Sequence, residues 1–259
     1  MIVCCDLDGV IWRGDAPIAG SGDAVAELRA AGLSVGFLTN NSSTTIADYI
    51  AKLASFGIPA TTDEIGTSAQ AAASLLAHTL SPGARVLACA GPGVVEALTT
   101  SGFTVVDDAP ADGLVVGWHR EFDFDRLTRA ADAARGGARF VATNLDPTYP
   151  VAGGLVPGAG ALVAAVATAS GVQPEVAGKP ERATTDLVRA RWGSTGVVVG
   201  DRPSTDGALA AALEWPFALV LSGVAGSAGE EPVPDPAPPF VAQDLARLAP
   251  MLIAAYAHA

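Results

Sequence analysis

The stretch MIVCCDLDGVIW, residues 1–12, indicates the fold and raises the question of why two acids stand at the end of a buried strand. A short apolar run predicts a buried strand, and Asp6 and Asp8 follow it directly. A buried carboxylate is costly unless something compensates it. In an extended chain, residues two apart point to the same side, so both acids can reach one site if the strand continues through them. Two carboxylates suit a hard cation such as Mg²⁺. The plainer interpretation is a turn after a strand.

Composition narrows the class of protein before any motif is considered. The chain has 259 residues, room for one large domain or two smaller ones, and its formal charge of −12 argues against nucleic acid or an acidic membrane surface as a partner. Three cysteines without a CxxC pair predict neither a disulfide framework nor a zinc knuckle. With no apparent signal peptide and no apolar run of spanning length, we expect a soluble, cytoplasmic protein.

Apolar strands alternate with alanine-rich helices along the chain. MIVCC (1–5), LSVGFLT (33–39) and TGVVVG (195–200) predict strands of a parallel sheet that is buried on both faces, the α/β class. Such sheets bind ligands at the carboxyl ends of their strands. We also predict a loop over 147–158, a helix over 204–214 and a surface loop in the proline-rich stretch near 230–239.

Three further polar stretches follow strands or occupy tight turns. Thr39 in FLTNNSS (37–43) offers a hydroxyl beside the amides of a coming helix, which together can bind an anion. Lys179 in GKP (178–180) can neutralise a carboxylate and a phosphoryl oxygen together. In VVVGDRPSTD, Asp201 can bind a metal, and Asp206 can orient Lys179 or a metal-bound water. Taken singly, each stretch is also explained by helix capping or by a surface turn.

Four polar stretches, taken together and in this order, resemble the haloacid dehalogenase (HAD) superfamily of aspartate-nucleophile phosphatases. They are DLDGV (6–10), LTNNS (38–42), GKP (178–180) and GDRPSTD (200–206). Three further stretches are similar to subfamily IIA, the NagD and p-nitrophenylphosphatase-like proteins with a C2a cap. They are TSAQAAASLL (67–76), GLVVGWHREFDFDRLTRA (113–130) and FVATNLDPTYP (140–150). The resemblance implies a Rossmann-like three-layer core over 1–79 and 176–259. An inserted α/β cap over 80–175 would choose the substrate.

The resemblance also implies a role for each matching residue of the core. Asp6 would be the nucleophile that forms an aspartyl-phosphate, and Asp8 the general acid and then the general base. Lys179 would steady the nucleophile and the phosphoryl group. The phosphoryl group would be held by Thr39, Asn40 and Asn41. Mg²⁺ would be bound by Asp6, Asp201 and the backbone carbonyl of Asp8, with Asp206 behind them.

The cap residues imply how a substrate is selected. Asn144, Asp146 and Tyr149 would lie in a loop that faces the leaving group, although Tyr149 is equally explained as packing in a cap turn. Where the subfamily often has a carboxylate after the VVG stretch, this chain has Trp118 and His119. His119 is either a substrate contact or a loop histidine satisfied by its surroundings.

The function expected from these residues is Mg²⁺-dependent hydrolysis of small phosphomonoesters. A phosphomutase or phosphotransferase of the same superfamily is the enzyme alternative, and a catalytically silent phosphate-binding module is the other. The expected partner is a small phosphorylated metabolite, and a homodimer through the cap stays open. The sequence leaves open which ester is the substrate: a nucleotide, a sugar phosphate, phosphoglycolate, glycerol phosphate or pyridoxal phosphate.

Overall fold

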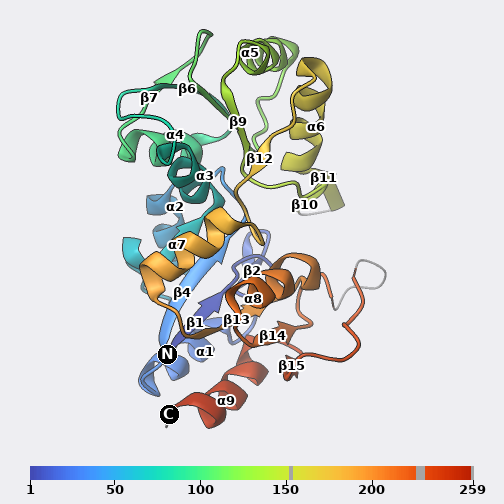
Figure 1. Cartoon of the computed structure of the whole chain (residues 1–259). Coiled ribbons are helices and arrows are strands. Elements are labelled where there is room, and N and C mark those ends of the chain that lie inside the picture. The colour runs from blue at the N-terminus through green and yellow to red at the C-terminus, as the bar shows by residue number, and fades with distance from the viewer. Residues whose placement is uncertain (152–153, 226–230, 258–259) are drawn as a thin grey trace. The chain divides into compact units, whose positions relative to one another are not determined.

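A computed structural model describes residues 1–151, 154–225 and 231–257 (Figure 1). The chain divides into two compact units. The first unit comprises residues 1–39, 47–66 and 188–259, and the second comprises residues 40–46 and 67–187. These units are defined by how the chain packs. The predicted core (1–79 and 176–259) and cap (80–175) were instead defined by resemblance to a family, so those domain boundaries stay a prediction.

The first unit is built on a six-stranded sheet with the order β15-β14-β13-β1-β4-β5. Its strands are β1 (Ile2–Cys5), β4 (Ser34–Thr39), β5 (Ile65–Thr67), β13 (Gly196–Gly200), β14 (Phe217–Val220) and β15 (Phe240–Ala242). β1 lies between β13 and β4 and pairs with both in parallel. Every residue of β1 and of β13 is buried, as expected for a sheet with two covered faces. The predicted α/β fold class is confirmed.

The helices of this unit and one small hairpin complete its layers. The helices are α1 (Ser21–Ala30), α2 (Ile46–Ser55), α7 (Arg182–Trp192), which enters from the second unit, α8 (Ala208–Leu213) and α9 (Leu245–Tyr256), with a short turn η1 (Thr62–Glu64). A core cluster packs Ile2 and Cys4 of β1 against Val198, Leu209 and Leu219. The next strands along the chain, β2 (Trp12–Arg13) and β3 (Ala16–Pro17), form an antiparallel hairpin that the sequence pattern did not indicate.

The predicted helix over 204–214 begins differently in the structure. A π-helical turn, η2 (Pro203–Gly207), precedes α8. The carbonyl of Arg202 accepts hydrogen bonds from the amides of Asp206 at 2.8 Å and Gly207 at 3.5 Å, so the first turn is wider than an α-helical turn. Such wide turns often occur at functional sites, and this one carries Asp206.

The second unit is a five-stranded parallel sheet with helices on both faces. The sheet order is β12-β9-β8-β6-β7. Its strands are β6 (Arg85–Cys89), β7 (Thr104–Val106), β8 (Gly113–Val116), β9 (Arg139–Ala142) and β12 (Glu175–Val176), and its helices are α3 (Ser68–Ala77), α4 (Pro92–Thr100), α5 (Phe124–Arg135) and α6 (Ala159–Ser170). One core cluster joins α3 and α4 to the sheet and a second joins α5 and α6, and many of their members are alanines. Alanine lets a helix lie close to the strands that it covers.

The predicted loop over 147–158 is wrong. β10 (Thr148–Val151) and β11 (Gly154–Pro157) form an antiparallel hairpin in which Tyr149 pairs with Val156 and Thr148 with Pro157. Glycines and prolines in this stretch suggested a loop, but the β-branched and aromatic residues between them favour strands. Residues 152 and 153 lie outside the described part of the chain.

Two other expectations concern the chain as a whole. Residues 231–239 of the proline-rich stretch contain neither helix nor strand, which confirms the predicted loop over the part that is described. Among the described residues, every helix is too short or too polar to cross a bilayer.

Candidate active site

The topology of the first unit brings three polar side chains to one edge of its sheet. In the sheet, Cys5 of β1 is paired with Val199 of β13 and Phe37 of β4. Asp6 continues this register, since its amide donates to the Val199 carbonyl at 2.9 Å. Asp201 directly follows β13 and Thr39 ends β4, so these two residues flank Asp6 from the neighbouring strands. The carboxyl ends of parallel strands are where such sheets bind ligands.

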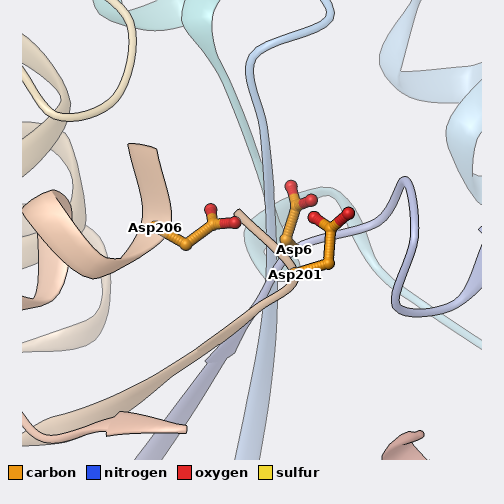
Figure 2. Close-up of side chains that lie close together, drawn as sticks. All are labelled: Asp6, Asp201 and Asp206. Carbon is orange, nitrogen blue, oxygen red and sulfur yellow. The ribbon is translucent and has the colours of Figure 1, made fainter. Parts of the chain in front are cut away.

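Three carboxylates gather at this edge (Figure 2). Asp6, Asp201 and Asp206 each offer one oxygen, and these oxygens lie within 4.8 Å of one another. The residues are only 8 %, 4 % and 1 % exposed. Three buried like charges at this separation are unfavourable without a cation. Their hard oxygen donors match the ligands of Mg²⁺ or Ca²⁺, so the residues present fit a divalent cation. The family resemblance implied that Asp206 lies behind the ligands, and the structure brings its carboxylate into the same group.

Asp201 is held by a backbone donor and by two glycines. Its Oδ2 accepts a hydrogen bond from the Val224 amide at 2.6 Å. A Cβ built on Gly223 would lie 1.8 Å from that Oδ2, and one built on Gly9 would lie 2.3 Å from it. Gly9 also has a φ of +81°, a left-handed conformation that favours glycine. Neither position has room for a side chain while Asp201 keeps its place.

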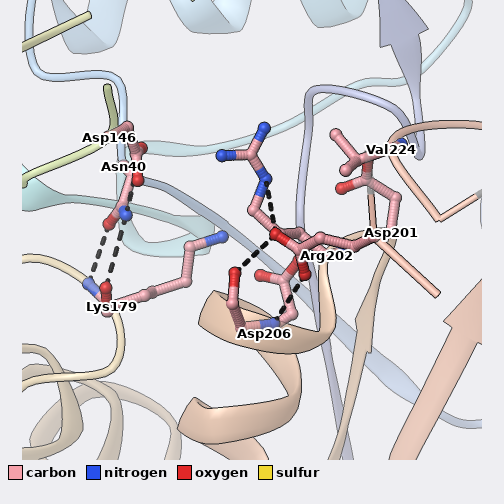
Figure 3. A network of polar contacts seen from close by, with 9 residues as sticks. Asn40, Asp146, Lys179, Asp201, Arg202, Asp206 and Val224 are labelled. Carbon is pink, nitrogen blue, oxygen red and sulfur yellow. Dashed lines mark hydrogen bonds and ion pairs between the residues drawn. The ribbon is translucent and has the colours of Figure 1, made fainter. Parts of the chain in front are cut away.

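Asp206 is fixed by the wide turn that carries it (Figure 3). Its Oδ2 accepts a hydrogen bond from the Arg202 amide at 3.2 Å, and its own amide donates to the Arg202 carbonyl at 2.8 Å. A Cβ on Gly200 would lie 2.3 Å from the Cβ of Asp206, so the strand approaches this acid closely. These contacts aim the carboxylate at the end of β13.

Asp8 does not continue the strand. The amides of Ile11 and Trp12 both donate to the Leu7 carbonyl, at 2.9 and 3.2 Å, and the chain turns there. Asp8 is half-buried, and its Oδ1 accepts a hydrogen bond from the indole Nε1 of Trp12 at 2.9 Å. The condition under which Asp6 and Asp8 would point to the same side, a strand through both, is therefore not met.

In the second unit, the predicted residues Asn40, Asn144, Asp146 and Lys179 form one polar network. The Asn40 side chain accepts from the Lys179 amide at 2.8 Å and donates to the Lys179 carbonyl at 3.4 Å (Figure 3). It also donates to Asp146 Oδ2 at 3.5 Å. The Asn144 side chain donates to the Asn40 carbonyl at 2.7 Å. Both Asn40 and Lys179 are buried.

A second contact set in this unit joins Asn41 to Tyr149. Asn41 Nδ2 donates to the Tyr149 hydroxyl at 3.1 Å. The Tyr149 ring lies against the Trp118 ring with centroids 4.7 Å apart, and Trp118 Nε1 donates to the Pro157 carbonyl at 2.9 Å. Tyr149 therefore packs in its hairpin and also holds a polar contact.

His119 is buried, at 8 % exposed. Its Nδ1 lies 3.2 Å from the Gly117 carbonyl, so we assign the proton to Nδ1, and its ring meets Phe122 edge-on at 5.8 Å. Its Nε2 has no hydrogen-bond partner among the described residues. Burial lowers the pKa of His119, and the bond to Gly117 only partly offsets this. The neutral ring fits the apolar contact with Phe122.

Sequence reasoning missed the residues that hold the acids in place. Asp8 is contacted by Trp12 of the following hairpin. Asp201 is contacted by Gly223 and Val224, which follow another strand of the first unit. Trp118 was noted as a departure from the family pattern, without a role. A tryptophan four residues after an acid is the one signal that could have indicated a contact.

Known proteins similar to this chain are phosphatases. Residues 3–104 match the model of the haloacid dehalogenase-like hydrolase family, and residues 176–248 match an HAD-hydrolase-like model. The D-glycerol 3-phosphate phosphatase of Mycobacterium tuberculosis is 40 % identical over 251 residues, which are 94 % of this chain and 69 % of that protein. An acid sugar phosphatase of Staphylococcus saprophyticus is 38 % identical over 176 residues, 68 % of each chain.

Solved structures give the same relationship. The crystal structure of the Mycobacterium tuberculosis glycerol phosphate phosphatase in complex with magnesium has a TM-score of 0.85 at 37 % identity, covering 95 % of this chain and 75 % of that one. The p-nitrophenyl phosphatase from Archaeoglobus fulgidus has a TM-score of 0.86 at 30 % identity, covering 97 % of this chain and 98 % of that one.

Proposed function

The chain belongs to the haloacid dehalogenase-like hydrolase family, in its NagD-like subfamily IIA, and from this premise we propose that it hydrolyses small phosphomonoesters with Mg²⁺ through an aspartyl-phosphate on Asp6. The observation that carries the proposal is the group of three buried carboxylates, Asp6, Asp201 and Asp206, at the carboxyl edge of a parallel sheet. A relative whose structure is described as a complex with magnesium supports the choice of metal.

The proposed chemistry uses two aspartates of the first unit. An Asp6 oxygen attacks phosphorus while Asp8 gives its proton to the departing ester oxygen, and the phosphoryl group is then bonded to Asp6. Asp8, now a carboxylate, takes a proton from a water molecule that attacks the same phosphorus. The bond from phosphorus to the Asp6 oxygen breaks, the electron pair returns to the Asp6 carboxylate, and phosphate leaves. Bound by Asp6, Asp201 and Asp206, Mg²⁺ would supply positive charge against the carboxylate and phosphoryl oxygens.

The roles of Thr39, Asn40, Asn41 and Lys179 as phosphate-binding groups are carried over from the family and stay a proposal. Thr39 is buried at the end of β4, beside the strand that carries Asp6. For Lys179, the support is that its backbone is fixed by Asn40 and its side chain is buried.

Small esters are the proposed substrates because the named relatives act on them. One is called a D-glycerol 3-phosphate phosphatase and another an acid sugar phosphatase. The hairpin of β10 and β11 carries Tyr149, and Asn144 and Asp146 precede it, which is the segment proposed to face the leaving group. Which class of ester is preferred is the question that a substrate screen answers.

The test is phosphate release from a panel of phosphate esters by the purified protein with Mg²⁺, run beside the Asp6→Asn variant. The panel should contain glycerol phosphates, sugar phosphates, nucleotides, phosphoglycolate, pyridoxal phosphate and p-nitrophenyl phosphate. We expect rapid release from one or more small esters and none by the variant. Transfer of the phosphoryl group to a second acceptor without release would favour a mutase. An inert protein across the panel would favour a binding module.

A further inference from the structure

Asp8, the proposed general acid, is hydrogen-bonded by Trp12, which has no role in the mechanism proposed above. Trp12 Nε1 donates to Asp8 Oδ1 at 2.9 Å, and Trp12 is only 1 % exposed. A buried indole N–H needs a hydrogen-bond acceptor, and here the acceptor is a carboxylate oxygen. This hydrogen bond uses Oδ1 as the acceptor, which a carboxyl group offers whether or not its other oxygen carries a proton, so it fixes the Asp8 side chain in one orientation.

The Trp12 ring is itself fixed from several directions. Tyr49 stacks on it with centroids 6.4 Å apart, and Phe56 meets it at 5.9 Å. Lys52 Nζ lies 4.3 Å from the ring centroid and donates to the Gly14 carbonyl at 2.8 Å. This cation over the ring face also ties α2 to the hairpin of β2 and β3. A ring held in this way has one direction for its N–H.

The hairpin that carries Trp12 is anchored to the loop that holds Asp201. Arg13 Nε donates to the Ser222 carbonyl, and Ser222 Oγ donates to the Gly9 carbonyl at 2.7 Å. The next residues, Gly223 and Val224, contact Asp201. The contacts that orient Asp8 are therefore connected, through Arg13 and Ser222, to the residues that orient Asp201.

We propose that Trp12 is the positioning residue of Asp8 and that its N–H sets how well the enzyme cleaves esters whose leaving group needs a proton. The inference rests on the proposed function. When the phosphorus–oxygen bond breaks, the electron pair stays on the ester oxygen, and the Asp8 carboxyl supplies the proton to it. A strongly basic leaving oxygen needs that proton, whereas p-nitrophenolate leaves without it. Losing the orientation of Asp8 should therefore penalise basic leaving groups selectively.

The test compares phenyl phosphate with p-nitrophenyl phosphate, two esters of similar shape that differ in leaving-group basicity. Replacing Trp12 with 3-benzothienylalanine keeps the ring shape and deletes only the N–H, and Trp12→Phe is a second variant. We expect the ratio of kcat/KM for phenyl phosphate to that for p-nitrophenyl phosphate to fall about fivefold or more in both, and further in Asp8→Asn. Phe240→Leu, which removes a ring contact with Tyr256 elsewhere in the first unit and does not touch Trp12 or Asp8, should lower Tm and leave the ratio unchanged.

A second readout needs neither metal nor turnover. The ¹H–¹⁵N indole resonance of Trp12 in the metal-free protein should move in Asp8→Ala, while the resonances of the other three tryptophans stay in place. An unmoved Trp12 resonance, or Trp12 variants that keep the wild-type ratio while Asp8→Asn loses it, would overturn the inference alone. An unchanged ratio in Asp8→Asn would instead remove Asp8 as the general acid.

Discussion

The side chain of Asn40 forms two hydrogen bonds with the backbone of Lys179, 139 positions away along the chain. The Lys179 amide donates to Asn40 Oδ1 at 2.8 Å, and Asn40 Nδ2 donates back to the Lys179 carbonyl at 3.4 Å. A Cβ on Gly178 would lie 2.7 Å from the same Oδ1, so the GKP turn lies directly against this carboxamide. An asparagine that the family pattern assigns to phosphate binding therefore also fixes the backbone of the lysine.

Asn40→Ala should destabilise the second unit. The variant leaves the buried Lys179 amide without its side-chain acceptor, which costs about 1–3 kcal/mol. Denaturant unfolding monitored by circular dichroism measures the loss. Asn40→Asp keeps an acceptor for that amide but sets a carboxylate beside Asp146, so it should recover only part of the stability. Unchanged unfolding in Asn40→Ala would show that these bonds contribute little.

Asp6→Asn should abolish turnover and leave the fold intact, because an amide is a poor nucleophile of nearly the same volume. In the metal-free protein it should also raise Tm, since it removes one of three buried carboxylates whose oxygens lie within 4.8 Å of one another. Hydrolysis of p-nitrophenyl phosphate and a thermal scan in EDTA are the two measurements. Wild-type hydrolysis by the variant would remove Asp6 as the nucleophile.

Activity should require Mg²⁺ and disappear in EDTA. Ca²⁺ should substitute badly, because its larger and looser coordination would misplace the reacting groups. Mg²⁺ should also raise the Tm of the wild-type protein by binding the folded state, and this shift should shrink in Asp201→Asn. Full activity of thoroughly chelated protein would contradict the metal requirement.

Tyr149→Ala should change which small ester is preferred, shifting relative kcat/KM values several-fold, the effect of about 1–2 kcal/mol of contact. The Mg²⁺ requirement should remain. Tyr149→Phe is the matched control, since it keeps the ring against Trp118 and loses the hydroxyl that accepts a hydrogen bond from Asn41. A uniform change across all esters in Tyr149→Ala would assign Tyr149 to packing alone.

His119 should make stability fall as the solution is acidified. Burial lowers its pKa in the folded protein below the ordinary 6.5, so below about pH 6.5 the unfolded chain binds a proton that the folded protein does not. The free energy of unfolding should therefore decrease as pH falls from about 6.5 to the lowered folded pKa and stay level, for this group, below it. His119→Leu should lack this component. Parallel stability–pH curves for the two proteins would contradict the assignment.

The acids were predictable because they follow apolar strands whose pairing the sequence already indicates. Asp6, Thr39 and Asp201 come at the ends of adjacent strands, so a parallel sheet brings them to one edge. The polar network around Asn40 follows from a family pattern, and the structure joins its predicted members by hydrogen bonds.

The remaining features depend on contacts that no local pattern encodes. The bond from Trp12 to Asp8 requires the chain to turn at Leu7, where a strand had been considered. The wide turn at 203–207 brings Asp206 close to Gly200 of a neighbouring strand, and the sequence pattern of this stretch predicts an ordinary α-helix equally well. The hairpin at 148–157 was obscured because its glycines and prolines are also typical of loops.

Gly223 and Gly9 have a consequence for how this protein can evolve. Neither carries a functional group, yet each stands where a single methyl group would displace the Oδ2 of Asp201. Natural selection for the carboxylate is therefore also selection against any side chain at these two positions, on loops that follow different strands. A comparison that ranks positions by the chemistry of their side chains would rate both glycines as neutral, although they are as constrained as the acid between them.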